Sequence, residues 1–383
     1  MKRIAILGST GSIGQNALEI VRNLPDKFKV TALSANSNAA LLLKQIREFR
    51  PSYVCIGDVA SAERLRGLLG KTRLLTGKDG FLEIVAKPEI EEVLIAISGS
   101  AALEPLLEAI KNNKQIALAN KEALVMAGSI IMEATRRKKV KLIPIDSEQS
   151  AIWQCVEGKD KEKIRQIYLT ASGGPFRNIS AKAMRNVSVE MVLNHPRWKM
   201  GKKVTVDSAT LMNKGLELIE AMFLFDVSLD KIRILIHPQA IIHSMVEFID
   251  GIILAQLSIT DMRIPIQYAL TYPERLHNAL HSVDFCSLKK LDFEKPDCKR
   301  FPCLELAYAA AKKMGTAPCV LNAANEVSVE EFLKGKIKFY SIPKVIEKVL
   351  SKHINKEKPT LEDIREIDSW ARRKADEVIN RCN

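Results

Sequence analysis

Several features that mark particular classes of protein are scarce in this 383-residue sequence. Aromatic residues make up 5% of it, so few side chains are available for nucleic-acid bases to stack on. No run of about 18 apolar residues occurs, which argues against a membrane-spanning helix. With 47% hydrophobic and 27% charged residues, the composition is that of a globular protein with two or three domains.

The seven cysteines contain no CxxC pair. The two that lie closest in sequence, Cys298 and Cys303, have no histidine near them at the spacing of zinc ligands. The N-terminal MKRIAILGSTGSIG has an apolar stretch too short and too glycine-rich for a signal peptide, and it fits a strand and turn better. We therefore expect reduced thiols, no structural zinc and a cytoplasmic protein.

The formal net charge of +13 raises nucleic acid as a partner. The basic residues are spread along the chain, however, and no helix-turn-helix or zinc-finger motif is present. An anionic small substrate explains the charge equally well. We expect such a substrate, with no nucleic-acid and no membrane partner.

The first residues predict a dinucleotide-binding fold. Residues 3–8 are typical of a buried parallel strand, GSTGSIG follows them, and a helical pattern begins near Ala17. A strand, a glycine-rich turn and a helix N-terminus together form a cradle for phosphate. The spacing is GxxGxxG rather than GxGxxG, so for this motif alone a tight turn without a ligand remains the alternative.

More apolar segments continue this pattern through the N-terminal third of the chain. The further strand candidates are residues 30–33, 53–56, 93–97, 115–119 and 141–145. Helical patterns lie between them, as a doubly wound parallel sheet requires. We predict an α/β protein whose residues 1–145 form a doubly wound, Rossmann-like domain.

The segment after the second predicted strand contains no acidic residue. Many NAD enzymes place a carboxylate there to bind the ribose 2′-hydroxyl. A carboxylate would repel the 2′-phosphate of NADP, so its absence from LSANSN (33–38) favours NADP. The candidate donors to that phosphate are Ser34, Asn36, Ser37 and Asn38, with Lys44 or Arg47 nearby.

Carboxylates in two parts of the chain predict a metal site. Asp146 and Glu148 follow the strand candidate 141–145, and alternate residues of an extended chain point to the same side. Glu217 is the natural third ligand, with Glu220 behind it. Ligands that are all oxygen indicate Mg²⁺ or Mn²⁺. The alternative is that Asp146 caps the next helix while Glu148 faces solvent.

Residues 195–220, HPRWKMGKKVTVDSATLMNKGLELIE, combine groups that suit a bound phosphate. We expect a loop, a short apolar run, a polar turn at Asp207 and Ser208, and then a helix. A glycine-rich turn that follows another strand candidate, 166–170, adds a further hydroxyl. The predicted phosphate pocket consists of Ser172, Ser208, Asn213 and Lys214. For Ser172 alone a turn residue, and for Lys214 alone a solvated helix amine, is the favoured alternative.

The loop 195–203 predicts a lid over the site. Trp198 lies in a strongly polar stretch, where an indole exposed to water is unfavourable, and Met200 follows it. Closure over a ligand would exclude water. Packing of Trp198 against the body of the protein is the alternative.

Taken together, the motifs resemble those of the 1-deoxy-D-xylulose 5-phosphate reductoisomerases. The matching segments are GSTGSIG, ANKEAL (119–124), PIDSEQSAIWQ (144–154), ASGGPF, HPRWKMG, VDSATLMNKGLE, HPQAIIHSMVEF (237–248) and LNAANE (321–326). The resemblance extends from residue 1 to about residue 335. It implies an enzyme that uses NADPH and Mg²⁺ or Mn²⁺ to convert 1-deoxy-D-xylulose 5-phosphate, a small phosphorylated ketose, to 2-C-methyl-D-erythritol 4-phosphate for isoprenoid synthesis.

The resemblance also implies a homodimer of three-domain chains. The NADPH domain (1–145) would be followed by an α+β catalytic and dimerisation domain (146–275). A linker (276–292) would lead to a C-terminal α-helical domain (293–383), where residues 342–349 and 361–379 have helical patterns. This last domain offers no site chemistry of its own, so we expect it to support the catalytic domain.

Individual roles follow from the positions that match the family motifs. The implied metal ligands are Asp146, Glu148 and Glu217, and the implied catalytic residues are Lys121, Glu148, Glu217 and His195. The implied substrate contacts are Ser147, Glu148, Ser172, His195, Trp198, Met200, Ser208, Asn213, Lys214 and Glu217. The implied cofactor contacts are Thr10, Gly11, Ser12, Ile13, Asn38, Asn120, Glu122 and Gly201. Asn36 is added to them from its position after the second predicted strand.

Two departures from the family pattern are visible. Where the family often has Gly-Lys-Asn after the second strand, this chain has Asn36-Ser37-Asn38. Where many members have histidine after the Asp-Ser-Glu motif, this chain has Gln149. The first departure affects the expected contacts to the 2′-phosphate, and the second suggests that the histidine is not needed for the chemistry.

A short-chain dehydrogenase or epimerase is the rival enzyme class. Tyr308 and Lys312 fit its YxxxK pattern. They lie far downstream of the predicted cofactor domain, in the alanine-rich LELAYAAAKK. We therefore expect them to be a core and a surface position of a helix.

Overall fold

A computed structural model describes residues 1–180, 182–194 and 201–381 of the chain, which divides into two compact units. Unit 1 comprises Met1–Ala123, Ile131–Ser150 and Asp261–Ala279. Unit 2 comprises Leu124–Ile130, Ala151–Thr260 and Leu280–Asn383. The chain therefore enters each unit more than once.

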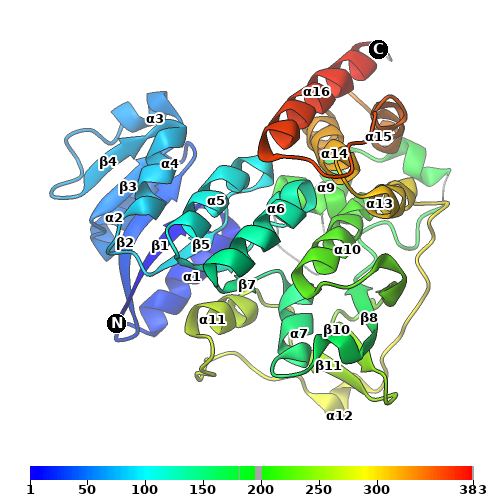
Figure 1. Ribbon diagram of the computed structural model, residues 1–383, viewed down its shortest axis with the longest axis horizontal. Helices are drawn as coiled ribbons and strands as arrows, with labels where there is room; N and C mark the ends of the chain where they lie inside the picture. Colours follow the sequence, from blue (N-terminus) through cyan, green and yellow to red (C-terminus); the bar gives the residue numbers. More distant parts are fainter. Residues whose placement is uncertain (181, 195–200, 382–383) are drawn as a thin grey trace. The chain divides into compact units, whose positions relative to one another are not determined.

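Seven parallel strands form the sheet of unit 1 (Figure 1). They are β1 (Lys2–Leu7), β2 (Phe28–Ala35), β3 (Tyr53–Ile56), β4 (Arg73–Thr76), β5 (Glu92–Ile95), β6 (Gln115–Leu118) and β7 (Leu142–Pro144). Their order is β4-β3-β2-β1-β5-β6-β7, so the direction of winding reverses between β1 and β5. Right-handed crossovers then place helices on both faces. The predicted doubly wound class is confirmed, and only β4, which has one buried residue, was not foreseen.

The helices of unit 1 connect these strands. They are α1 (Ser12–Asn23), α2 (Ala39–Phe49), α3 (Val59–Glu63), α4 (Gly77–Ala86), the 3₁₀ turn η1 (Gly99–Ala102), α5 (Leu103–Lys111) and α11 (Arg263–Thr271). Two further helices, α6 (Glu122–Lys138) and α7 (Ser147–Val156), have residues in both units. Late in the chain, α11 packs against α1, β6 and β7. The Lys2 ammonium donates to the Leu270 carbonyl at 2.7 Å and secures its end.

A four-stranded mixed sheet lies in unit 2, in the order β11-β10-β8-β9. Its strands are β8 (Ile164–Ala171), β9 (Ile232–Ile236), β10 (Ile242–Phe248) and β11 (Ile253–Leu257). The shorter helices of unit 2 are η2 (Lys161–Lys163), η3 (Ala183–Asn186), α8 (Val189–Leu193), η4 (Leu229–Lys231) and α12 (Phe285–Leu288). The strand predicted over 166–170 is confirmed as part of β8, which pairs in parallel with β9 and antiparallel with β10.

Two helices that carry predicted site residues, α9 (Lys202–Thr210) and α10 (Met212–Phe225), also belong to unit 2. Close contacts between helices fix the position of α10. A Cβ atom added at Gly215 would lie 2.3 Å from the Cβ of Ala307 in α13, and one at Gly128 would meet the ring of Phe223. Glycine at 215 and 128 therefore lets α10 pack closely against its neighbours.

Four helices form the C-terminal part of unit 2 (Figure 1). They are α13 (Pro302–Lys313), α14 (Ala317–Leu333), α15 (Ser341–Ser351) and α16 (Leu361–Asn380). The central helix α14 packs against the other three, and nearly all its side chains are buried. A capping box begins α16, because Thr360 accepts from the Asp363 amide while Asp363 accepts from the Thr360 amide. The helices predicted over 342–349 and 361–379 are confirmed. In the part of the chain described, no helix has both the length and the apolar character to cross a membrane.

Candidate active site

The glycine-rich turn after β1 has the geometry of a phosphate cradle. Gly8 has φ +87°, and a Cβ atom there would lie 2.6 Å from the Ala96 carbonyl oxygen. A Cβ at Gly14 would lie 2.3 Å from the Gly8 carbonyl oxygen. Only glycine allows the backbone to close this tightly. The turn lies at the C-terminal end of β1, where the strand order reverses and where α/β proteins bind their ligands.

The N-terminus of α1 completes the cradle. Gly11 is its N-cap, the first turn has no acidic residue, and no side chain of the described structure caps it. The first amide groups of α1 therefore remain available for an anion. Thr10, Gly11, Ser12 and Ile13 are all at least partly exposed, so a ligand can reach each of these predicted cofactor contacts.

The predicted 2′-phosphate contacts after β2 divide into two groups. Asn36, Ser37 and Asn38 are exposed, although the Asn38 side chain also caps α2 by accepting from the Leu41 amide at 3.1 Å. The prediction for Ser34 is wrong. This residue is fully buried, and its hydroxyl accepts from the Gly8 amide at 3.1 Å, so it supports the cradle instead.

Asn120 and Glu122 build the wall beside the cradle. The Asn120 amide donates to the carbonyls of Ile97 and Gly99 and to the Glu122 carboxylate, each at 2.9 Å. Its oxygen accepts from the Ala123 amide at 2.8 Å. These bonds hold the loop after β5, which begins at the residues that face Gly8. Direct contact of Asn120 and Glu122 with a cofactor stays a prediction.

The junction of β7 and α7 carries three predicted residues of unit 1. The nearly buried Lys121 ammonium lies 2.5 Å from Asp146 Oδ2, and the Ser147 hydroxyl donates to Glu148 Oε2 at 2.5 Å. The expectation that Asp146 and Glu148 alternate along an extended chain is wrong, because α7 begins at Ser147. Glu148 instead occupies the first helical turn, where the helix dipole favours a negative charge.

The polar turn predicted at Asp207 and Ser208 is also wrong. Both residues lie within α9, whose buried side includes Val206, Asp207 and Ala209. The chain breaks later, at Leu211, which has φ 60° between α9 and α10. The prediction failed because, in the sequence, an aspartate that will be buried in a helix cannot be told from one in a turn. Only its partners in the fold distinguish the two.

The structure brings the Ser172 turn of unit 2 against Ser208. Gly173 and Gly174 both have positive φ, and the Ser172 hydroxyl accepts from the Gly174 amide at 3.3 Å. A Cβ atom at Gly174 would lie 2.7 Å from the Ser208 carbonyl oxygen. Two hydroxyls of the predicted phosphate pocket are thus carried by segments in direct contact.

The first turns of α10 connect phosphate donors to a carboxylate. Glu217 is fully buried, and its two oxygens accept hydrogen bonds from the Asn213 amide and the Lys214 ammonium. Lys214 is itself buried, which makes this charge pairing necessary. Glu220, one turn further on, is buried as well.

The predicted lid lies mostly outside the described residues, which exclude His195, Trp198 and Met200. Gly201 is described: it is exposed and is the N-cap of α9. The Thr205 hydroxyl donates to the Gly201 carbonyl at 3.0 Å.

Asp146, Glu148 and Glu217 are a group of carboxylates that could hold a metal ion. Ligands that are all oxygen fit Mg²⁺ or Mn²⁺ rather than zinc.

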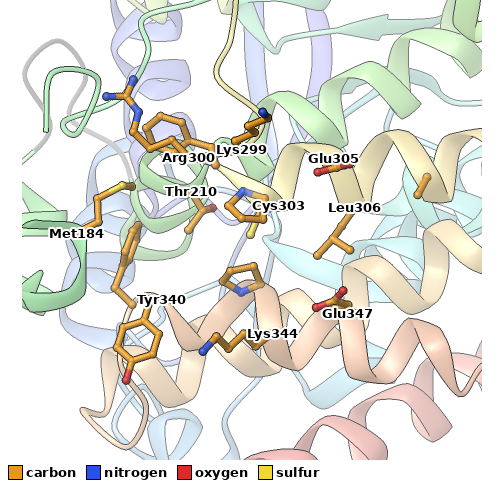
Figure 2. Close-up of a pocket in the computed structure, with 15 residues that line it drawn as sticks. Met184, Thr210, Lys299, Arg300, Cys303, Glu305, Leu306, Tyr340, Lys344 and Glu347 are labelled. Atoms are coloured by element: carbon orange, nitrogen blue, oxygen red, sulfur yellow. The ribbon is translucent and has the colours of Figure 1, made fainter. Parts of the chain in front are cut away.

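A cavity of about 930 Å³ lies within unit 2, between the first turns of α13 and α15 (Figure 2). Its lining mixes apolar residues such as Leu306 with the charged Lys344 and Glu347, and it includes Thr210 at the end of α9. Of the residues predicted for the site that the structure describes, none is among those that line this cavity.

The structure also tests the rival short-chain dehydrogenase reading. Tyr308 and Lys312 lie in α13, the lysine is exposed, and burial raises the pKa of the Tyr308 hydroxyl to about 12. A tyrosine of that kind is a poor acid–base catalyst near neutral pH. As expected, both residues lie on a helix and Lys312 is at its surface, but Tyr308 is half-buried rather than a core position.

The fold and the site together define a class. A Rossmann-like domain with a phosphate cradle, combined with carboxylates suited to Mg²⁺ or Mn²⁺, is typical of a metal-assisted oxidoreductase that uses a dinucleotide. Comparison with models of known protein families narrows this class to one family. The model of 1-deoxy-D-xylulose 5-phosphate reductoisomerase matches residues 4–128, that of its C-terminal domain matches residues 142–225, and that of the DXP reductoisomerase C-terminal domain matches residues 257–374.

Full-length relatives agree with these matches. The reductoisomerase of Caldanaerobacter subterraneus is 53% identical over 370 residues, which cover 96% of this chain and 97% of the relative. That of Desulforamulus reducens is 50% identical over 386 residues and covers all of both chains. The chain belongs to the 1-deoxy-D-xylulose 5-phosphate reductoisomerase family.

Solved structures confirm the fold. The Zymomonas mobilis reductoisomerase in complex with NADPH has a TM-score of 0.91 and 41% identity, with 99% of both chains covered. A DOX-P reductoisomerase in complex with NADPH, fosmidomycin and magnesium has a TM-score of 0.93 and 39% identity, with 99% of this chain and 98% of that chain covered. The class and family expected from the motifs are therefore confirmed.

Proposed function

We propose that this enzyme converts 1-deoxy-D-xylulose 5-phosphate to 2-C-methyl-D-erythritol 4-phosphate with NADPH and Mg²⁺ or Mn²⁺, in the non-mevalonate isoprenoid pathway. The observation that carries the proposal is the start of α10, where Asn213 and Lys214 contact Glu217. Donors suited to a phosphate and a carboxylate suited to a metal thus share one helical turn. Relatives with NADPH and magnesium bound support the same ligands.

The residues of the site fit both a divalent metal ion and the dinucleotide cofactor. The proposed metal ligands are Asp146, Glu148 and Glu217, all of which offer oxygen, and a bound Mg²⁺ or Mn²⁺ would polarise the substrate carbonyl as a Lewis acid. The proposed cofactor contacts are Thr10, Gly11, Ser12, Ile13, Asn36, Asn38, Asn120, Glu122 and Gly201. NADPH held there would supply the hydride for the reductive half of the reaction.

The substrate phosphate would be held away from the reacting carbons. In our proposal Ser172 and Ser208 donate through their hydroxyls, Asn213 through its amide and Lys214 through its ammonium. The contact of Gly174 with Ser208 supports this, because it holds the two serine segments together. Binding of the phosphate group, which does not react, would provide the free energy to orient the carbon skeleton of the substrate.

At the reacting end, we assign roles to Lys121 and Ser147. The Lys121 ammonium beside Asp146 would keep a positive charge next to the substrate oxygens, and Ser147 would hydrogen-bond the substrate beside the metal. His195, Trp198 and Met200 enter the proposal through the family motif HPRWKMG, as a substrate contact and a lid.

The organisation of the chain belongs to the same proposal. It comprises an NADPH domain (1–145), a catalytic and dimerisation domain (146–275), a linker (276–292) and a helical domain (293–383), in a homodimer. We also propose a cytoplasmic location, which the free thiols of the six described cysteines support. Light scattering and cell fractionation test these two points.

The deciding experiment is NADPH oxidation with 1-deoxy-D-xylulose 5-phosphate, with and without Mg²⁺ or Mn²⁺. We expect turnover only with metal. Glu217→Gln should abolish turnover while NADPH still binds, because it weakens the metal site and leaves unit 1 unchanged. Glu331→Gln is the control, since it removes a carboxylate that pairs with Lys334 and Lys336 instead. Retained turnover in Glu217→Gln would contradict the metal assignment.

A further inference from the structure

The central C-terminal helix α14 places a buried amide against α9. Asn325 is fully buried, and its Nδ2 donates to Asp207 Oδ1 at 2.8 Å. Asp207 is 1% exposed, and its other oxygen lies 2.8 Å from the Lys203 ammonium. Only the amide nitrogen can donate to a carboxylate, so the orientation of the Asn325 side chain follows from chemistry. A buried carboxylate is stable only with such partners, and this one therefore holds α9 to α14.

The residue held in this way lies next to a proposed phosphate ligand. Asp207 precedes Ser208 directly, and α9 ends shortly afterwards at the left-handed Leu211. Asn213 follows at the start of α10. The carbonyl of Ser208 is itself in close contact with Gly174. A small rotation of α9 would move Ser208 and the α9–α10 turn relative to the Ser172 segment.

We propose that Asn325 is a positioning residue for the phosphate-binding part of the site. By bonding Asp207, it fixes the rotation of α9 and with it the placement of Ser208 and the turn before Asn213. This inference rests on the proposed function, in which Ser208 and Asn213 bind the substrate phosphate. It gives the C-terminal helical segment a defined effect on substrate binding, beyond general support.

The same helix offers a matched control at Asn322. This residue lies one turn earlier on α14 and is also fully buried. Its amide donates to Glu326 Oε1 at 3.0 Å, and Glu326 pairs with Arg372 of α16 at 2.5 Å. Asn322 therefore contributes to the contact of α14 with α16, whereas Asn325 contacts α9.

The test compares Asn325→Ala with Asn322→Ala in the full-length enzyme. Measurements are kcat, the KM for 1-deoxy-D-xylulose 5-phosphate, the Kd for NADPH and the midpoint of urea unfolding. Both variants should lose stability. Asn325→Ala should raise the KM by about tenfold or more, with kcat and NADPH binding changed little, because a hydrogen bond to a charged group is lost beside Ser208. Asn322→Ala should leave the KM within about twofold.

A reciprocal exchange keeps the proposal testable if Asn325→Ala folds poorly. Asn325→Asp alone places two carboxylates together and should raise the KM further. Combination with Asp207→Asn restores one amide–carboxylate hydrogen bond, and the KM should return to within about threefold of the wild-type value. Equal KM values in Asn325→Ala and Asn322→Ala, or no recovery in the double variant, would overturn the positioning role.

Ser208→Ala separates this inference from the proposed function. A raised KM in Ser208→Ala with an unchanged KM in Asn325→Ala would overturn only the positioning role. An unchanged KM in Ser208→Ala would instead overturn the assignment of Ser208 to the substrate phosphate.

Discussion

Buried polar residues decide much of the local structure of this enzyme. Ser34, predicted as a cofactor contact, instead supports the Gly8 turn. Asp207, predicted in a turn, lies inside a helix and bonds Asn325. Both predictions failed for the same reason: residue type indicates that a side chain needs a polar partner, but only the fold determines whether that partner is a ligand or another residue.

The residues after β2 should set the preference for NADPH over NADH. Asn36 is exposed immediately after the strand, where a carboxylate would repel the 2′-phosphate. We expect the wild-type enzyme to prefer NADPH markedly. Asn36→Asp should lower kcat/KM for NADPH by about tenfold, or 1.4 kcal/mol, and change NADH little. Asn36→Ala controls for loss of the amide, and comparable wild-type efficiency with both coenzymes would contradict the prediction.

Glu92 should make stability depend on pH. It is fully buried in β5, with one oxygen 2.6 Å from the Lys2 ammonium, and burial raises the pKa of its carboxyl to about 7. This folded-state pKa lies above the value in the unfolded chain, so protonated Glu92 contributes to the free energy of unfolding. The contribution is complete below about pH 4.5 and is lost as the pH rises through 7. Between pH 4.5 and 8 the loss amounts to up to about 3 kcal/mol.

Urea unfolding of the wild type and Glu92→Gln at both pH values measures this effect. The variant cannot ionise, so its stability relative to the wild type should increase toward pH 8. A wild type that gains stability relative to Glu92→Gln as pH rises would show that the Lys2 pairing outweighs burial.

At the scale of elements, the sequence pattern predicted whether a segment forms a strand or a helix better than it predicted where the segment begins and ends. The strands of unit 1 were predictable because buried parallel strands are short apolar runs separated by amphipathic helices. The helices α15 and α16 followed from the helical patterns over 342–349 and 361–379. The boundary between α9 and α10 was not predictable, because Leu211 adopts a left-handed conformation that leucine does not signal.

The close contact of Gly174 with Ser208 in α9 leads to a specific prediction. Gly174→Ala would force a Cβ atom to 2.7 Å from the Ser208 carbonyl oxygen and strain a backbone with φ +67°. We expect the KM for 1-deoxy-D-xylulose 5-phosphate to rise at least about tenfold, at a cost of about 1–3 kcal/mol in stability. Gly158→Ala is the control, because Gly158 also has positive φ but nothing lies within 4 Å of its Cβ position. The same KM in both variants would contradict the prediction.

At the scale of the whole molecule, metal binding should increase the stability of the folded protein against heat. An ion that binds only the folded chain stabilises it by about 2.7 kcal/mol at one hundred times its Kd. We expect Mg²⁺ or Mn²⁺ to raise the thermal midpoint of the wild type by at least about 2–4 °C, and EDTA to reverse this. Glu217→Gln should show no such rise, although NADPH should still stabilise it. An equal response of both proteins to metal would indicate a nonspecific ion effect.

The sequence by itself determined the class of the fold, the family and the residue types available at the site. Apolar periodicity specifies which segments become strands and helices, and motif spacing specifies which polar side chains they carry. The tertiary structure alone decided that residues 261–279 return to unit 1, that the Ser172 turn meets Ser208, and that Asn325 bonds Asp207. Each of these depends on contacts between residues far apart in the chain, and a single sequence carries no local signal for them.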